Sequence, residues 1–152
     1  MEKTLNIAIV SHDRRKIDTI EWARHNVEFL CKHNLFCTGT TGSLIKKMFE
    51  EENCENPNVI CYKSGPVGGD LEIGAQVVNG LIDFCIFLID DLNPNPHESD
   101  IQALLRQCRI HNVPVACNRH SADLMITSSL WDTDYTPSKP KYVDFKREDI
   151  VG

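Results

Sequence analysis

The chain has 152 residues, of which 41% are hydrophobic and 25% are charged, and this composition fits one domain with a single core rather than a disordered chain. Its 16 basic and 22 acidic side chains give a net charge of −6 without a basic stripe, which argues against binding to nucleic acid or to an anionic membrane. No apolar run approaches the roughly 18 residues of a membrane span, and residues 1–4 lack the features of a signal peptide. We therefore expect a cytoplasmic protein with a small substrate.

Five short apolar runs predict strands, at residues 5–10, 35–37, 59–62, 84–89 and 113–117. Apolar residues spaced three or four apart predict helices at residues 17–31, 44–49, 73–78 and 101–108, and a short helix is expected after Ser121. Pro114 should occupy the first positions of its strand. The alternation predicts a single-domain α/β fold, with a doubly wound, mostly parallel five-stranded sheet flanked by helices on both faces.

Two polar segments interrupt this pattern. Residues 50–57, rich in Glu and Asn, are expected to form a solvated surface loop. Residues 128–152 form a polar C-terminal extension in which only residues 142–145 resemble an edge strand. Because we find no internal repeat and no linker, residues 1–152 are interpreted as one domain.

The seven cysteines contain no C-x-x-C pair, so their spacing indicates neither a zinc site nor a redox dithiol. Four of them lie in apolar, strand-like runs: Cys37, Cys61, Cys85 and Cys117. We interpret these cysteines as small buried hydrophobic side chains of a protein in a reducing compartment.

The carboxyl ends of parallel strands form the usual ligand site of such a sheet, so the residues after each strand matter most. The first strand is followed by the sequence HDRRK, residues 12–16. Asp13 could cap the next helix and Lys16 could be solvated. Alternatively, Lys16 adds a mobile positive charge to the backbone N–H groups of a helix N-terminus, which suits an anion.

The second and third strands are followed by glycine-rich loops. TGTTG, residues 38–42, is either a plain turn or a set of donors for phosphate oxygens, and it matches neither the Walker lysine loop nor the dinucleotide pattern. SGPVGGD, residues 64–70, demands a defined backbone path, because three glycines and a proline surround few bulkier residues. Asp70 ends that path, either as a simple N-cap or as a functional carboxylate.

The segment after the fourth strand carries Asp90, His97 and Asp100. The two aspartates could merely end a strand and cap a helix, whereas His97 could polarise a carbonyl group. Carboxylates and an imidazole beside a phosphate pocket suggest proton transfer next to a phosphorylated group. The H-x-x-D spacing is too little for a metal site. The other four histidines are assigned to the surface or the core: His25, His33, His111 and His120.

Four motifs occur in the same order and on the same strand ends as in the methylglyoxal synthase family: HDRRK, TGTTG, SGPVGGD and, from Asp90 to Asp100, D-x-L-N-x-x-P-H-x-x-D. The chain closely resembles this family from about residue 5 to 127. The resemblance implies a lyase that converts dihydroxyacetone phosphate to methylglyoxal and inorganic phosphate through an enediolate, in the methylglyoxal bypass of glycolysis. It implies no cofactor and no metal, a homohexamer as the assembly, and inorganic phosphate as product and inhibitor.

By the same resemblance, Asp70 is the base, and Asp90, His97 and Asp100 complete the catalytic set. The implied substrate and phosphate pocket contains His12, Asp13, Lys16, Thr38, Thr40, Thr41, Ser64, Gly65 and Asp90. An ordinary aspartate, with a pKa of about 3.9, is a weak base, so Asp70 should be desolvated or coupled to Asp100. A neutral His97 should donate a hydrogen bond to the carbonyl oxygen.

The chain departs from the family in three places. Extra residues precede SGP in the Glu-rich stretch, and the segment around Asp91 and Ser99 lacks the prolines that are more usual there. The family's C-terminal arginine, which reaches a neighbouring subunit, has only Arg147 as a candidate counterpart. Two other functions remain open for this fold: an effector-binding module as in carbamoyl-phosphate synthetase, and a purine cyclohydrolase. The first does not need Asp70, His97 and Asp100 together, and the second normally belongs to a much longer chain.

Overall fold

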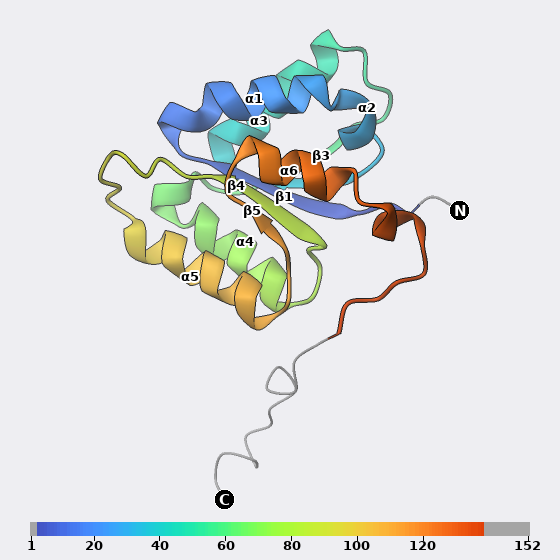
Figure 1. Cartoon of the computed structure of the whole chain (residues 1–152). Helices are drawn as coiled ribbons and strands as arrows, with labels where there is room; N and C mark the ends of the chain where they lie inside the picture. The colour runs from blue at the N-terminus through green and yellow to red at the C-terminus, as the bar shows by residue number, and fades with distance from the viewer. Residues whose placement is uncertain (1–2, 139–152) are drawn as a thin grey trace, which may run out of the picture.

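A computed structural model describes residues 3–138 as a five-stranded parallel sheet with strand order β3-β2-β1-β4-β5 (Figure 1). The strands are β1 (Asn6–Ser11), β2 (Asn34–Cys37), β3 (Asn58–Cys61), β4 (Phe84–Leu88) and β5 (Val115–Ala116). Each strand falls on or within one residue of a predicted apolar run. Pro114 was expected at the first positions of its strand, but β5 begins at Val115, directly after it. The predicted α/β fold is therefore confirmed.

Helices cover both faces of the sheet (Figure 1). One face carries α1 (Lys16–His25), α2 (Val27–Leu30), α3 (Gly39–Glu51) and α6 (Arg119–Ile126), and the other carries α4 (Gly69–Val78) and α5 (Glu98–Ile110). Three short 3-10 helices complete the described chain: η1 (Asp13–Arg15), η2 (Gly65–Val67) and η3 (Ser129–Asp132). Within residues 3–138, none of these helices is long and apolar enough to cross a membrane.

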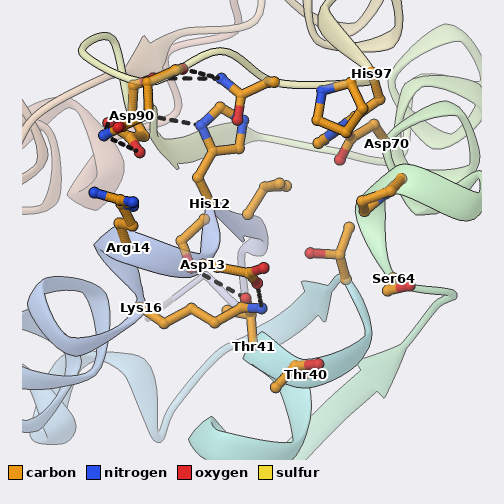
Figure 2. Close-up of a pocket in the computed structure, with 18 of the residues that line it drawn as sticks. His12, Asp13, Arg14, Lys16, Thr40, Thr41, Ser64, Asp70, Asp90 and His97 are labelled. Carbon is orange, nitrogen blue, oxygen red and sulfur yellow. Dashed lines mark hydrogen bonds and ion pairs between the residues drawn. The ribbon is translucent and has the colours of Figure 1, made fainter.

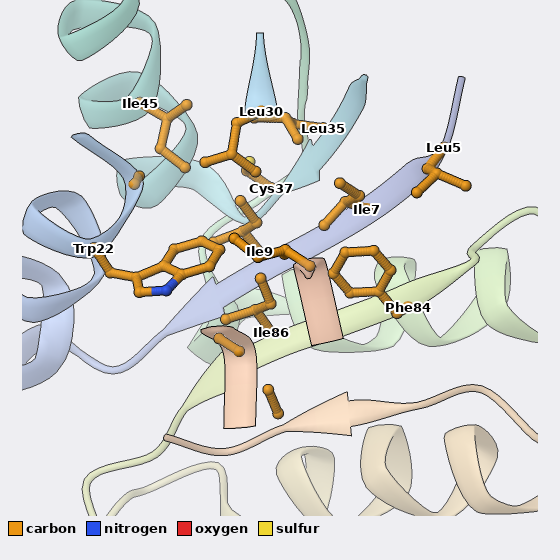
Figure 3. Close-up of a cluster of buried hydrophobic side chains, with 14 of the residues drawn as sticks. Leu5, Ile7, Ile9, Trp22, Leu30, Leu35, Cys37, Ile45, Phe84 and Ile86 are labelled. Carbon is orange, nitrogen blue, oxygen red and sulfur yellow. The ribbon is translucent and has the colours of Figure 1, made fainter. Parts of the chain in front are cut away.

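The two layers bury two separate apolar clusters, one on each face of the sheet. On the α1 and α3 face, Trp22 and Ile45 pack with Ile7, Ile9 and Phe84 from the strands (Figure 3). On the opposite face, the intervening strand residues such as Ala8 pack with residues of α4 and α5. Because both faces of β1 and β4 are covered, neither strand shows the polar alternation of a half-exposed sheet.

The helical predictions need four corrections. The first helix is interrupted at Asn26, which separates α1 from α2, and Ile17 is 81% exposed although it was placed on the apolar face. Thr19 and Trp22 occupy the buried face of α1 instead. Val78 is also exposed, and α6 begins before Ser121 because the Asn118 side chain accepts a hydrogen bond from the Ser121 amide and caps the helix.

The cysteine prediction is correct for Cys37 and Cys85, which are buried, and wrong for Cys61 and Cys117, which are exposed. Cys61 lies on β3, an edge strand, and Cys117 directly follows the short β5 at the opposite edge, so neither is fully covered. The structure also contains a disulfide, which the sequence analysis did not predict and which was not expected in a protein of a reducing compartment. It joins Cys31 to Cys54, whose Cα atoms are 6.0 Å apart.

The Glu-rich segment lies on the surface, as predicted, although α3 continues into it as far as Glu51. Arg24 forms ion pairs with Glu51 and Glu52, and these pairs attach the end of α3 to α1. The predicted edge strand at residues 142–145 and the candidate Arg147 lie outside the residues that the structure describes.

Candidate active site

A cavity of about 560 Å³ lies at the carboxyl ends of the strands, where the β1, β2, β3 and β4 loops converge (Figure 2). Of the predicted site residues, Asp100 alone is not among those lining it. The lining comprises Val10, Ser11, His12, Asp13, Arg14, Lys16, Thr38, Thr40, Thr41, Ser64, Gly65, Pro66, Asp70, Asp90, Asn93, Pro94, Asn95, Pro96 and His97. Four sequence segments separated along the chain are thus brought to one place, as expected for this type of sheet.

His12 is held between β1 and β4 in a single tautomer. Its Nδ1 accepts a hydrogen bond from the backbone N–H of Asp90 at 2.7 Å, so a neutral His12 carries its proton on Nε2. Burial, followed by the nearby His97, lowers the pKa of His12. Nε2 is buried without a hydrogen-bond partner, so it presents a donor to a molecule in the cavity.

The threonine-rich loop forms the N-terminus of α3. Thr38 occupies the N-cap position without making a side-chain cap bond, and the Thr41 hydroxyl lies 3.1 Å from that of Ser11. The amides of Thr40 and Thr41 belong to the first turn, where backbone donors have no acceptor within the helix. These donors, the helix dipole and Lys16 together make a site suited to an anion.

Lys16 begins α1 and is hydrogen-bonded to Asp13, whose side chain is 94% exposed. This ion pair and its hydrogen bond lower the pKa of Asp13. Asp13 does not cap a helix through its side chain, because the N-cap positions of η1 and α1 carry no side-chain cap bond.

The glycine-rich loop carries Asp70 into the protein interior. Gly68, with φ of +114°, occupies the N-cap position of α4, and a side chain on Gly69 would overlap the backbone carbonyl of Lys63. The next residue, Asp70, is 0% exposed. The capping interpretation of Asp70 is therefore wrong, since Gly68 occupies that position and the Asp70 side chain makes no hydrogen bond.

Asp70 and His97 form the buried centre of the cavity. Asp70 Oδ2 lies 3.2 Å from His97 Nε2, yet the angles are not those of a hydrogen bond, and both Asp70 oxygens are unpartnered. Burial raises the pKa of Asp70, the charge of His97 opposes this shift, and the charge of Asp100 adds to it. The expected desolvation of Asp70 is present, and Asp100 acts on Asp70 through its charge.

Unpartnered polar atoms are concentrated at this site. Within residues 3–138, four buried side-chain atoms have no hydrogen-bond partner: His12 Nε2, both Asp70 oxygens and His97 Nδ1. All four belong to residues that line the cavity. Because leaving a buried polar group unpaired costs about 1–3 kcal/mol, these atoms mark where a polar ligand fits.

Asp90 has a different environment from Asp70. Its carboxylate accepts hydrogen bonds from the Asn93 side chain at 3.1 and 3.0 Å and from the Leu92 amide at 3.3 Å. It therefore orders the loop that leads to His97. Asp100, half-buried in the first turn of α5, acts on Asp70 through its charge.

The sequence analysis did not single out several lining residues, namely Ser11, Arg14, Asn93 and Asn95. Arg14 lies two residues after His12 in the HDRRK run, and this position in the sequence could have indicated that it lines the site. Of the other histidines, His33 accepts a hydrogen bond from the Leu5 amide, as a core histidine does. In the described part of the chain, no three His, Cys, Asp or Glu residues are arranged to hold a metal ion.

Comparison with known proteins identifies the family. Residues 18–117 match the family model described as the MGS-like domain. The chain is 57% identical over 149 residues to a methylglyoxal synthase of Treponema socranskii, covering 97% of this chain and 94% of that protein. The chain belongs to the methylglyoxal synthase family.

Two further relatives agree with this result. A methylglyoxal synthase of Coxiella burnetii is 44% identical over 144 residues, which cover 95% of this chain and 96% of that protein. The crystal structure of methylglyoxal synthase from Elizabethkingia anophelis superposes with a TM-score of 0.81 at 37% identity, and covers 93% of this chain and 90% of that chain. The predicted resemblance is confirmed over almost the whole chain.

Proposed function

We propose that the chain is a carbon–oxygen lyase that converts dihydroxyacetone phosphate to methylglyoxal and inorganic phosphate. The observation that carries this proposal is the Asp70 carboxylate, which is fully buried, unpartnered at both oxygens and 3.2 Å from His97. Burial raises its pKa, and a carboxylate of higher pKa is a stronger base. The names of the relatives support the same reaction.

In the first step, Asp70 takes a proton from the hydroxymethyl carbon next to the ketone. The electron pair of the broken C–H bond moves toward the carbonyl oxygen and gives an enediolate. The ring of His97 donates a hydrogen bond to this oxygen in its neutral form, and the Nε2–H of His12 offers a second donor. Donors placed in advance around the developing charge lower the barrier without reorganisation.

In the second step, the hydroxyl on the deprotonated carbon gives its proton to the phosphate and becomes the aldehyde carbonyl, while the C=C electron pair shifts toward the carbon that carries the phosphate and the bond from that carbon to the phosphate oxygen breaks. The enolate that remains takes the proton held by Asp70 onto its CH2 carbon and becomes methylglyoxal. Lys16, the hydroxyls of Thr38, Thr40 and Thr41, and the α3 amides bind the departing phosphate. Ser64 and Gly65 complete this part of the cavity, and the proposed steps use no cofactor.

Asp90 and Asp100 act through other residues in this proposal. Asp90 orders the loop that carries His97 and fixes the His12 tautomer through its amide. Asp100 raises the pKa of Asp70. Asp13 is hydrogen-bonded to Lys16 and must share it with the phosphate when substrate binds.

The direct test is to incubate the purified protein with dihydroxyacetone phosphate and to follow methylglyoxal and free phosphate together. Release of both in equal amounts supports the lyase reaction. Phosphate binding without turnover would instead favour an effector-binding module. We further propose a homohexamer located in the cytoplasm, which light scattering and cell fractionation can test separately from turnover.

A further inference from the structure

The charges that line the cavity are unfavourable for the substrate of the proposed reaction. Three carboxylates, on Asp13, Asp70 and Asp90, face two cations, on Arg14 and Lys16. The whole chain also carries a net charge of −6. A phosphorylated substrate with two negative charges therefore enters a cavity in which carboxylates outnumber fixed positive charges.

The two cations differ in their partners. Lys16 is bound to Asp13, so part of its charge is already neutralised before an anion arrives. Arg14 is exposed, lines the cavity and forms no ion pair or hydrogen bond within residues 3–138. Figure 2 shows it below Asp90 and apart from the Lys16–Asp13 pair. Arg14 is thus the lining cation with its full charge available.

The neighbouring Arg15 explains why Arg14 stays there. Arg15 donates to the Ile89 carbonyl at 3.3 Å and pairs with Asp18 at 3.1 Å, which anchors η1 to the end of β4. Two consecutive arginines on this short 3-10 helix therefore have separate roles, one structural and one directed toward the cavity. The backbone that carries Arg14 is fixed even though its side chain is free.

From these observations we propose that Arg14 is the residue that attracts the phosphate dianion into the cavity and transfers it to Lys16 and the α3 N-terminus. This inference rests on the proposed function for its substrate, but the phosphate-binding role can be measured without turnover. Since Arg14 acts by charge on an approaching anion, its contribution belongs to capture and not to the chemical steps. Electrostatic attraction of this kind weakens as salt screens it.

The test replaces Arg14 by Gln and by Lys, with Arg109→Gln as a matched control that removes the same charge from an exposed site at the far end of α5. At low ionic strength, R14Q should lower kcat/KM about tenfold with kcat changed less than twofold, and R14K should restore most of kcat/KM. The difference between wild type and R14Q should shrink as sodium chloride is raised. R109Q should behave as the wild type.

Isothermal titration with inorganic phosphate separates this inference from the proposed reaction. Weaker phosphate binding by R14Q than by R109Q supports the role of Arg14 even if the protein turns over no dihydroxyacetone phosphate. Equal phosphate affinity in R14Q, R109Q and wild type overturns the inference. It is also overturned if R14K is as impaired as R14Q, because the requirement would then be guanidinium geometry and not charge.

Discussion

The two halves of the cavity are built differently. The acid–base half, Asp70 with His97 and His12, is buried and holds all the unpartnered buried side-chain atoms in residues 3–138. The phosphate half, Lys16 with the α3 threonines, is partly exposed, and two of its polar side chains are already paired, Lys16 with Asp13 and Thr41 with Ser11. Changes in the first half should therefore act on turnover, and changes in the second on affinity.

The largest effect is expected for Asp70→Asn, which keeps the shape of the side chain and removes the base. We expect kcat to fall by at least about 10³-fold, equivalent to about 4 kcal/mol of barrier, with phosphate affinity unchanged. Steady-state assays together with phosphate titration measure both quantities. Activity within tenfold of the wild type would reject Asp70 as the base.

His97→Asn keeps a hydrogen-bond donor but shortens its reach. We expect turnover to fall about 10²-fold with only a modest change in apparent substrate affinity, because the lost interaction forms mainly with the enediolate. Exchange of deuterium from heavy water into the hydroxymethyl carbon reports the first step alone. If the variant exchanges at the wild-type rate while phosphate release stalls, His97 acts in elimination instead.

In the phosphate half, Lys16→Ala should weaken substrate and inorganic phosphate alike, each about tenfold, because one charge-assisted contact serves both. Competition assays with phosphate and direct titration give the two constants. Lys47→Ala, on α3 but absent from the cavity lining, is the control for loss of a positive charge. A large fall in kcat with unchanged phosphate binding would place Lys16 in the acid–base half. The distinction between a half that acts on turnover and a half that acts on affinity would then be wrong.

The pH dependence of the unfolding free energy measures how much the buried, ionised Asp70 carboxylate destabilises the fold. The pKa of Asp70 is raised in the folded state, so the folded protein holds this proton more tightly than the unfolded chain does. Stability is favoured below the unfolded pKa of about 3.8 and is lost as pH rises through the raised folded value. Relative to Asp70→Asn, the wild type should lose about 1.4 kcal/mol of unfolding free energy for each unit by which the pKa is raised. Urea unfolding of both proteins between pH 4 and about 8 tests this, and parallel curves would contradict it.

Much of this arrangement could be predicted from the sequence, because parallel-strand topology brings loops from distant positions together without any knowledge of side-chain contacts. The strand ends at His12, Thr38 and Asp90 locate the cavity before any distance is known. The sequence could not show that Arg14 faces the cavity while Arg15 anchors η1, because both are arginines on one short turn.

The predictions of the helix faces and of the cysteine environments failed for a related reason. Ile17 fits a helical repeat but points to solvent, since the orientation of α1 is fixed by Trp22 packing against β1 and β4. Cys31 and Cys54 meet only because α2 and the turn after α3 end side by side. Periodicity and local spacing describe single elements, and neither contains the position of one element relative to another.

The Cys31–Cys54 disulfide should have the smallest effect on the site, although it encloses β2 and all of α3. Linking two residues 23 positions apart restricts the unfolded chain, and Cys31→Ser with Cys54→Ser should therefore lower stability by about 3 kcal/mol. Phosphate affinity should change less than twofold, because Gly39 and Thr41 are held by Lys63 and Ser11 at the opposite end of α3. Cys117→Ser, which removes an exposed free thiol, is the control. Thermal unfolding and phosphate titration of both variants measure the two effects. A loss of phosphate affinity in the double variant alone would contradict the prediction, because it would show that phosphate binding at the N-terminus of α3 depends on the disulfide near its C-terminus.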